Sequence, residues 1–211
     1  MMDRTRVIFL LLLLTGCTLL VAGCTTPRIG DSHNTTVVIQ SYNTWADQQV
    51  TYSTQVRSTF TQIGNTLNEY NHETAQGSSD TGTLQGDVVA DGQAINQWGS
   101  AGTTMGSATD SFSSDTASLS FGNDTETPWL TGFLLQEMKI YSIDMNNAQQ
   151  HFVDYNRDLS EYLSVNDPDY RDDSLRMEAM DAKAQALSSI ADGDNALSNI
   201  TATAKLIQER Q

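Results

Sequence analysis

The residue pair with the clearest potential for metal chemistry is Glu69 and His72, three positions apart. On a helix this spacing places a carboxylate and an imidazole one turn apart, where both can ligate a metal ion. A complete site in a helical bundle needs a second such pair and further inward carboxylates. No histidine follows His151, and no glutamate lies three residues before it. Because Tyr70 falls on the apolar face of this segment, we expect Glu69 and His72 to form a solvated surface pair.

An acidic group between residues 167 and 178 partly matches the spacing of calcium-binding loops. Acidic residues stand at positions 1, 3, 7 and 12 of such a loop: Asp167, Asp169, Asp173 and Glu178. However, Arg171 stands where a ligand is needed, and Asp172 stands where the loop requires glycine. We therefore expect Asp167 to cap a helix that has Pro168 as its first residue, with acidic side chains facing the helix dipole. A weak divalent-cation site at this acidic tip is the alternative.

Asp91 falls among the apolar residues of a helical pattern. A buried carboxylate needs a partner. In an antiparallel bundle Arg176, Lys183 or Tyr155 would lie at its level. The interpretation that we prefer is that the core contains water at this level and that Asp91 sets the register of the helices.

The N-terminal segment predicts a specific modification at Cys24. Arg4 and Arg6 precede an almost unbroken apolar run over residues 7–23, which is the layout of a signal peptide. The last four residues, Val21-Ala22-Gly23-Cys24, resemble the lipobox of prokaryotic lipoproteins, bacterial or archaeal. This resemblance implies that a diradyl glycerol group alkylates the Cys24 thiol and that the chain is cut just before it. The predicted parts are a signal peptide (1–23), a lipidated tether (24–35) and a bundle domain (36–211).

Three alternatives to modification at Cys24 stay open. A second lipobox-like match, Leu14-Thr15-Gly16-Cys17, would place the lipid on Cys17. We favour Cys24 because polar sequence begins at Thr25, whereas cutting before Cys17 would leave residues 19–21, which are apolar, in the mature chain. The apolar run of about 17 residues is also just long enough for an uncleaved membrane anchor. The last alternative is an ordinary secretory signal.

Apolar residues recur at alternating steps of four and three in four segments, approximately 38–70, 84–119, 134–162 and 177–207. The last series is the least regular: Met177, Met180, Ala184, Leu187, Ile190, Leu197, Ile200, Ala204 and Ile207. No segment alternates with the period of a strand. Short loops between long helices predict an all-α, elongated, antiparallel four-helix bundle with an up-down-up-down course. The alternative is a pair of long helical hairpins that dimerise.

The second helical segment contains many glycines, each of which costs about 1 kcal/mol relative to alanine. Gly92, Gly99 and Gly106 are nevertheless seven residues apart, each directly after a residue of the apolar series. A stripe of this kind lets a neighbouring helix approach closely. We therefore predict a helix here, with a mobile segment as the alternative.

Two tryptophans and three asparagines also need an interpretation. Trp45 and Trp129 fall near the tethered end of the bundle; we expect them to pack inside it, and contact with the membrane interface is the alternative. Asn34, Asn123 and Asn199 begin glycosylation sequons, and Asn123, in a loop, is the most accessible of them.

The formal net charge of −15 argues against nucleic-acid binding. We find no pattern for a catalytic site or a cofactor, and the sequence lacks the metal ligands that a metalloenzyme needs.

We therefore expect a lipid-anchored, non-enzymatic surface protein on the outer face of the cytoplasmic membrane, with an interaction or envelope role. The alternative is a ligand-sensing bundle that acts through a membrane partner. It is similar in outline to the four-helix extracytoplasmic domains of chemoreceptors, without a shared motif. A polar pocket in the middle of the bundle would favour that alternative.

Overall fold

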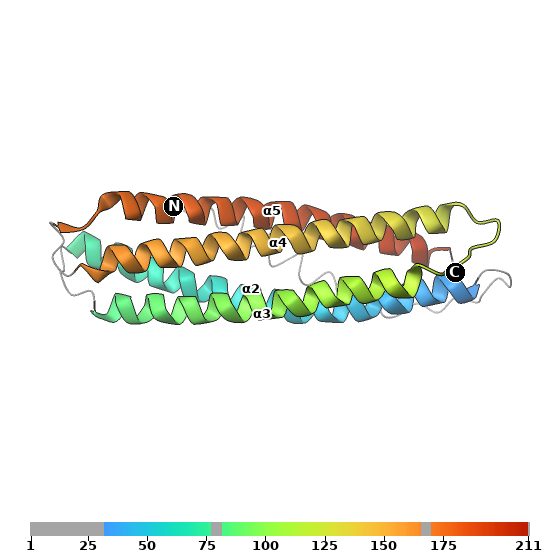
Figure 1. Cartoon of the computed structure of the whole chain (residues 1–211), viewed down its shortest axis with the longest axis horizontal. Coiled ribbons are helices and arrows are strands. Elements are labelled where there is room, and N and C mark those ends of the chain that lie inside the picture. The colour runs from blue at the N-terminus through green and yellow to red at the C-terminus, as the bar shows by residue number, and fades with distance from the viewer. Residues whose placement is uncertain (1–31, 77–81, 166–169, 211) are drawn as a thin grey trace.

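The computed structural model describes residues 32–76, 82–165 and 170–210, and these residues form an all-helical bundle. It has four α-helices: α2 (Ser32–Gln76), α3 (Gly82–Thr116), α4 (Glu126–Ser164) and α5 (Asp173–Gln208). They lie side by side along one elongated body (Figure 1). Within the described ranges there is no β-strand. The predicted number and type of elements are therefore confirmed.

Hydrogen bonds between helices show how residues pair along the bundle. Trp45 Nε1 donates to Thr109 Oγ1 (3.0 Å) and Thr59 Oγ1 donates to the Ala94 carbonyl (3.2 Å), so residue numbers rise along α2 as they fall along α3. The same reversed order links α3 with α4, through Thr109–Ser142 and Gln85–Leu163. It also links α4 with α5, through the hydrogen bond Asn199–Glu137, and an ion pair joins Arg210, just after α5, to Glu126.

The core is built from the apolar series that the sequence predicts in α2, α3 and α4. All nine residues of the predicted α4 series are buried: Leu134, Met138, Tyr141, Met145, Ala148, Phe152, Tyr155, Leu159 and Tyr162. The largest buried side chains are aromatic, and Trp45, Trp98 and Phe152 contact neighbouring rings across the helix interfaces. The glycine-containing segment is helical as predicted, because its apolar face is buried along almost its full length.

The predicted core face of α5 is wrong over its N-terminal half. Met177 is 66% exposed and Leu187 is also exposed, whereas Ala179, Ala182 and Ala186 are buried. Small side chains on this face let α5 pack closely against α4, and these two helices share the most extensive contact in the bundle. Larger residues at the same positions would hold the two helices apart.

The helix ends also differ from the sequence-based expectation. The N-cap of α5 is Asp172, whose carboxylate accepts from Ser174 N at 2.9 Å, and not Asp167. Residues 166–169 lie outside the described residues, as does most of the predicted tether. The helix α2 begins at Ser32, four positions before the predicted domain boundary. The helix α4 begins at Glu126, and Pro128 is its third residue, in the first turn, where proline is tolerated.

Candidate functional site

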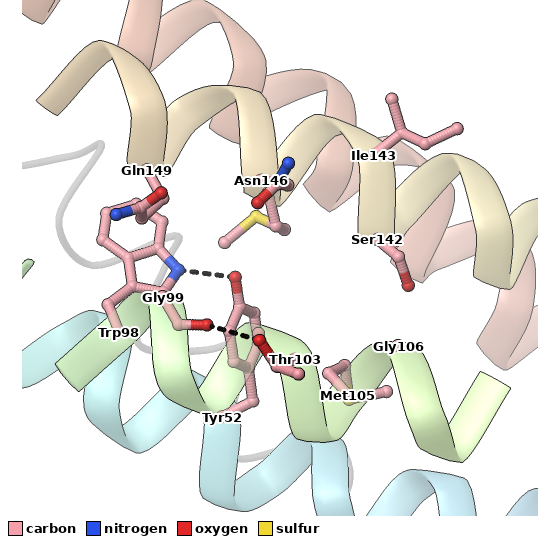
Figure 2. Close-up of a pocket in the computed structure, with 12 residues that line it drawn as sticks. Tyr52, Trp98, Gly99, Thr103, Met105, Gly106, Ser142, Ile143, Asn146 and Gln149 are labelled. Carbon is pink, nitrogen blue, oxygen red and sulfur yellow. Dashed lines mark hydrogen bonds between the residues drawn. The ribbon is translucent and has the colours of Figure 1, made fainter. Parts of the chain in front are cut away.

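A groove of about 250 Å³ lies between α3 and α4, halfway along the bundle (Figure 2). Its floor contains Tyr52 from α2 and Trp98 from α3, and Asn146 and Gln149 line it from α4. Thr103 and Ser142 add hydroxyl groups. The groove therefore combines aromatic surface with neutral hydrogen-bonding groups, as small-molecule sites commonly do.

Glycines of α3 create the space. A Cβ added at Gly106 would meet no heavy atom within 4 Å, and one added at Gly102 would lie 3.7 Å from Tyr52 Cε2. The predicted close approach of a neighbouring helix occurs at Gly92 and Gly99 but not at Gly106. At the first two positions a Cβ would lie 2.8 Å from Asn156 Nδ2 and 3.1 Å from Gln149 Nε2, respectively. One glycine series thus allows close packing at one level and opens a groove at the next.

The groove is electrically neutral. Trp98 Nε1 donates to Tyr52 Oη, which fixes both rings in the floor. Burial raises the pKa of Tyr52 to about 12, although the hydrogen bond with Trp98 lowers it, so this phenol stays protonated at neutral pH. Such a lining suits a small, uncharged, polar ligand.

Besides the groove, the carboxylate of Asp91 is a second unusual feature of the bundle, and it is fully buried as predicted. Neither carboxylate oxygen has a hydrogen-bond partner, and neither does the buried Tyr155 Oη. Thr66 and Gln62 approach the carboxylate without good hydrogen-bonding geometry. Burial raises the pKa of Asp91 to about 6.

The predicted cationic partners do not accompany Asp91. Tyr155 is close, since the charge of Asp91 adds to the effect of burial in raising the pKa of Tyr155. Arg176 instead pairs with Asp173 at 3.4 Å. Lys183 is half-buried, and desolvation lowers its pKa. The carboxylate therefore lies beside the neutral groups of Thr66, Gln62 and Tyr155, and the negative charge of Asp87 adds to the effect of burial on its pKa.

The remaining predicted residues are dispersed. His72 is exposed, as expected, and Glu69 is partly buried. In the part of the chain that the structure describes, no three His, Cys, Asp or Glu side chains come together as a metal site. Trp45 is buried as predicted, but the expectation that Trp129 also packs inside is wrong, because its side chain is exposed.

The three sequons differ in accessibility. Asn123 is exposed in the loop between α3 and α4. The Asn34 amide donates to the Ser120 carbonyl, and the Asn199 amide donates to Glu137 Oε2 at 2.9 Å. These hydrogen bonds favour Asn123 as the glycosylation candidate. The two lipidation candidates, Cys17 and Cys24, lie outside the described residues.

Comparison with known proteins finds no matching family model, no matching curated protein and no matching solved structure. Among the described helices, none has both the length and the apolar character needed to cross a membrane. The function of this chain is therefore inferred from its own residues.

Proposed function

We propose that this chain is a lipid-anchored, non-enzymatic surface protein, held on the outer face of the cytoplasmic membrane by a lipid on Cys24. The observation that carries this proposal is the charged and apolar leader that ends in Val21-Ala22-Gly23-Cys24 and is followed at once by polar sequence. The helix α2 begins at Ser32, so the bundle would start eight positions after the lipid. An anchor this close would keep the bundle at the membrane surface for interaction or envelope roles.

An up-down-up-down course of the four helices belongs to this proposal. It is supported by the reversed order in which residues of successive helices pair, such as Gln85 with Leu163 and Asn199 with Glu137. With that course the starts of α2 and α4 lie at the same end of the bundle, and this end would face the membrane.

Replacing the anchoring cysteine tests the proposal. We expect Cys24→Ser to move nearly all of the protein from the membrane fraction to the soluble fraction, because each buried CH₂ of the lipid contributes about 0.8 kcal/mol. The measurement is fractionation with mass spectrometry of the N-terminal peptide. Cys17→Ser is the matched control and should stay in the membrane. Membrane retention of Cys24→Ser, with residues 1–23 still attached, would instead indicate an uncleaved anchor.

The groove favours a second candidate function, the binding of a small ligand. Its neutral hydroxyl and amide groups beside an aromatic floor fit a small uncharged polar molecule. At about 250 Å³ it is slightly smaller than sites for drug-sized molecules, which start at roughly 300 Å³. A signal from such a site would require a membrane partner.

Filling the groove tests this second candidate. Gly106→Leu should place a side chain in the groove, whereas Gly86→Leu on the same helix adds one outside it; an added Cβ meets nothing within 4 Å at either position. Both variants should gain helix stability of roughly 0.5–1 kcal/mol. Neutral polyols, sugars and amides are screened by thermal shift. A hit should bind Gly106→Leu at least about tenfold more weakly, a loss of about 1.4 kcal/mol, and Gly86→Leu unchanged. Equal binding to both variants would exclude the groove.

A further inference from the structure

An aromatic pair, exposed Trp129 and partly buried Phe133, lies on the first turns of α4. Trp129 is 64% exposed and stacks on Phe133, with ring centroids 5.8 Å apart and planes 9° apart. The two residues are four positions apart and therefore share one helix face. Trp45 and Trp98 are 1% and 0% exposed, so Trp129 is the exposed member of the three tryptophans. Its exposure is not explained by packing within the bundle.

The pair lies at the end of the bundle from which the predicted lipid anchor extends. The Asn34 side chain, at the start of α2, donates to the carbonyl of Ser120, six residues before α4. Figure 1 shows the starts of α2 and α4 together at one end. Cys24 precedes Ser32 by eight positions, which span at most about 28 Å when fully extended. A lipid on Cys24 would therefore keep this end within reach of the bilayer surface.

Local charge does not prevent contact with a lipid surface. Two acidic residues lie close to Trp129 in sequence, Asp124 and Glu126. The Asp124 carboxylate accepts from the backbone N–H groups of Glu126 (2.9 Å) and Thr127 (3.1 Å), so its charge is held at the N-terminus of α4. The Glu126 carboxylate pairs with the Arg210 guanidinium. A zwitterionic surface would tolerate this arrangement, since tryptophan favours the interface between lipid and water.

A second copy of the chain fits the aromatic pair less well. Two aromatic side chains bury roughly 150–250 Å² each. Their sum is below the roughly 1,000 Å² that a stable protein interface needs. A small aromatic contact is sufficient, however, when a lipid already holds the protein at the surface.

We propose that Trp129, stacked on Phe133, inserts into the head-group region of the membrane that carries the lipid anchor and so orients the bundle on that surface. This inference rests on the proposed lipid anchoring. It adds a second contact, made by the folded domain itself, to the covalent lipid.

Quenching of tryptophan fluorescence by brominated lipid tests this contact. The lipidated full chain is reconstituted into phosphatidylcholine vesicles with and without dibrominated acyl chains, and flotation reports anchoring independently. Because Trp45 and Trp98 are buried, quenching should arise from Trp129. We expect a loss of emission in wild type that disappears in Trp129→Phe, a variant that keeps an aromatic ring beside Phe133.

A distal reporter provides the matched control. Tyr170 is exposed and lies just before α5, at the other end of the bundle. Tyr170→Trp in the Trp129→Phe background should float with the vesicles and remain unquenched. Flotation of wild type without quenching would overturn the membrane contact and leave the anchor intact, as would equal quenching of the distal reporter. Failure of wild type to float would remove the anchoring proposal, and this inference with it.

Discussion

Gly193→Leu is expected to destabilise the bundle by roughly 2–3 kcal/mol, because the new side chain would be forced between α4 and α5. A Cβ at Gly193 would lie 3.0 Å from Met145 Sδ and 3.3 Å from Met145 Cγ. The end of a methionine side chain can shift to accommodate one methyl group. It cannot make room for a whole leucine while Asp144 Cβ stands 3.7 Å away. Urea denaturation at neutral pH measures the loss.

Two substitutions separate overpacking from a general effect of glycine replacement. Gly193→Ala should be nearly neutral, because its gain in helix propensity of about 1 kcal/mol offsets the shift of Met145. Gly132→Leu is the control on α4, where an added Cβ meets nothing within 4 Å. If the Gly193→Leu variant were as stable as the wild-type protein, this result would contradict the close approach of α4 and α5.

The difference between α4 and α5 shows what the sequence can predict about a core. In α4 large apolar residues such as Met138 and Phe152 recur at alternating steps of four and three, and this spacing identifies the buried face, although Ile143 outside the series is exposed. In α5 the buried face carries Ala182 and Ala186, while Ala184 between them is exposed. These residues are chemically identical, so only the distance to α4 decides which of them is buried. The spacing of large apolar residues therefore predicts, wrongly, that Met177 and Leu187 are buried.

The same limit applies to the candidate sites. The burial of Asp91 follows from its place in a regular series, and the sequence predicts it. Its neighbours Thr66, Gln62 and Tyr155 come from α2 and α4, whereas the two cations that the sequence predicts beside it, Arg176 and Lys183, lie on α5. The sequence predicts the glycine stripe of α3 but not the groove. Whether a glycine permits close packing, as at Gly92, or leaves a space, as at Gly106, depends on the side chain that α4 places opposite.

Asp91→Asn is expected to stabilise the protein at neutral pH by roughly 2–3 kcal/mol, the free energy that corresponds to a pKa raised from 3.8 to about 6. The folded chain keeps the Asp91 proton up to about pH 6, whereas the unfolded chain releases it near its ordinary pKa. Folding therefore takes up a proton between these two values. Stability from this group is full at lower pH, falls as pH rises through the window, and stays low above it.

Chemical denaturation of wild type and variant from pH 3.5 to 8 measures this linkage. The stability difference should be near zero at the acidic limit and reach its maximum above pH 6, because asparagine does not titrate. Asp110→Asn is the control, since Asp110 is exposed on the same helix. If Asp91→Asn were destabilising at neutral pH, the ionised carboxylate would be stabilised by a positive charge or by a tightly held polar partner. Among the residues that the structure describes, no cation lies beside Asp91, and this fixes the sign of the expected result. An ionised carboxylate among Thr66, Gln62 and Tyr155, with the negative charge of Asp87 nearby, weakens the fold, and removing its charge should strengthen it.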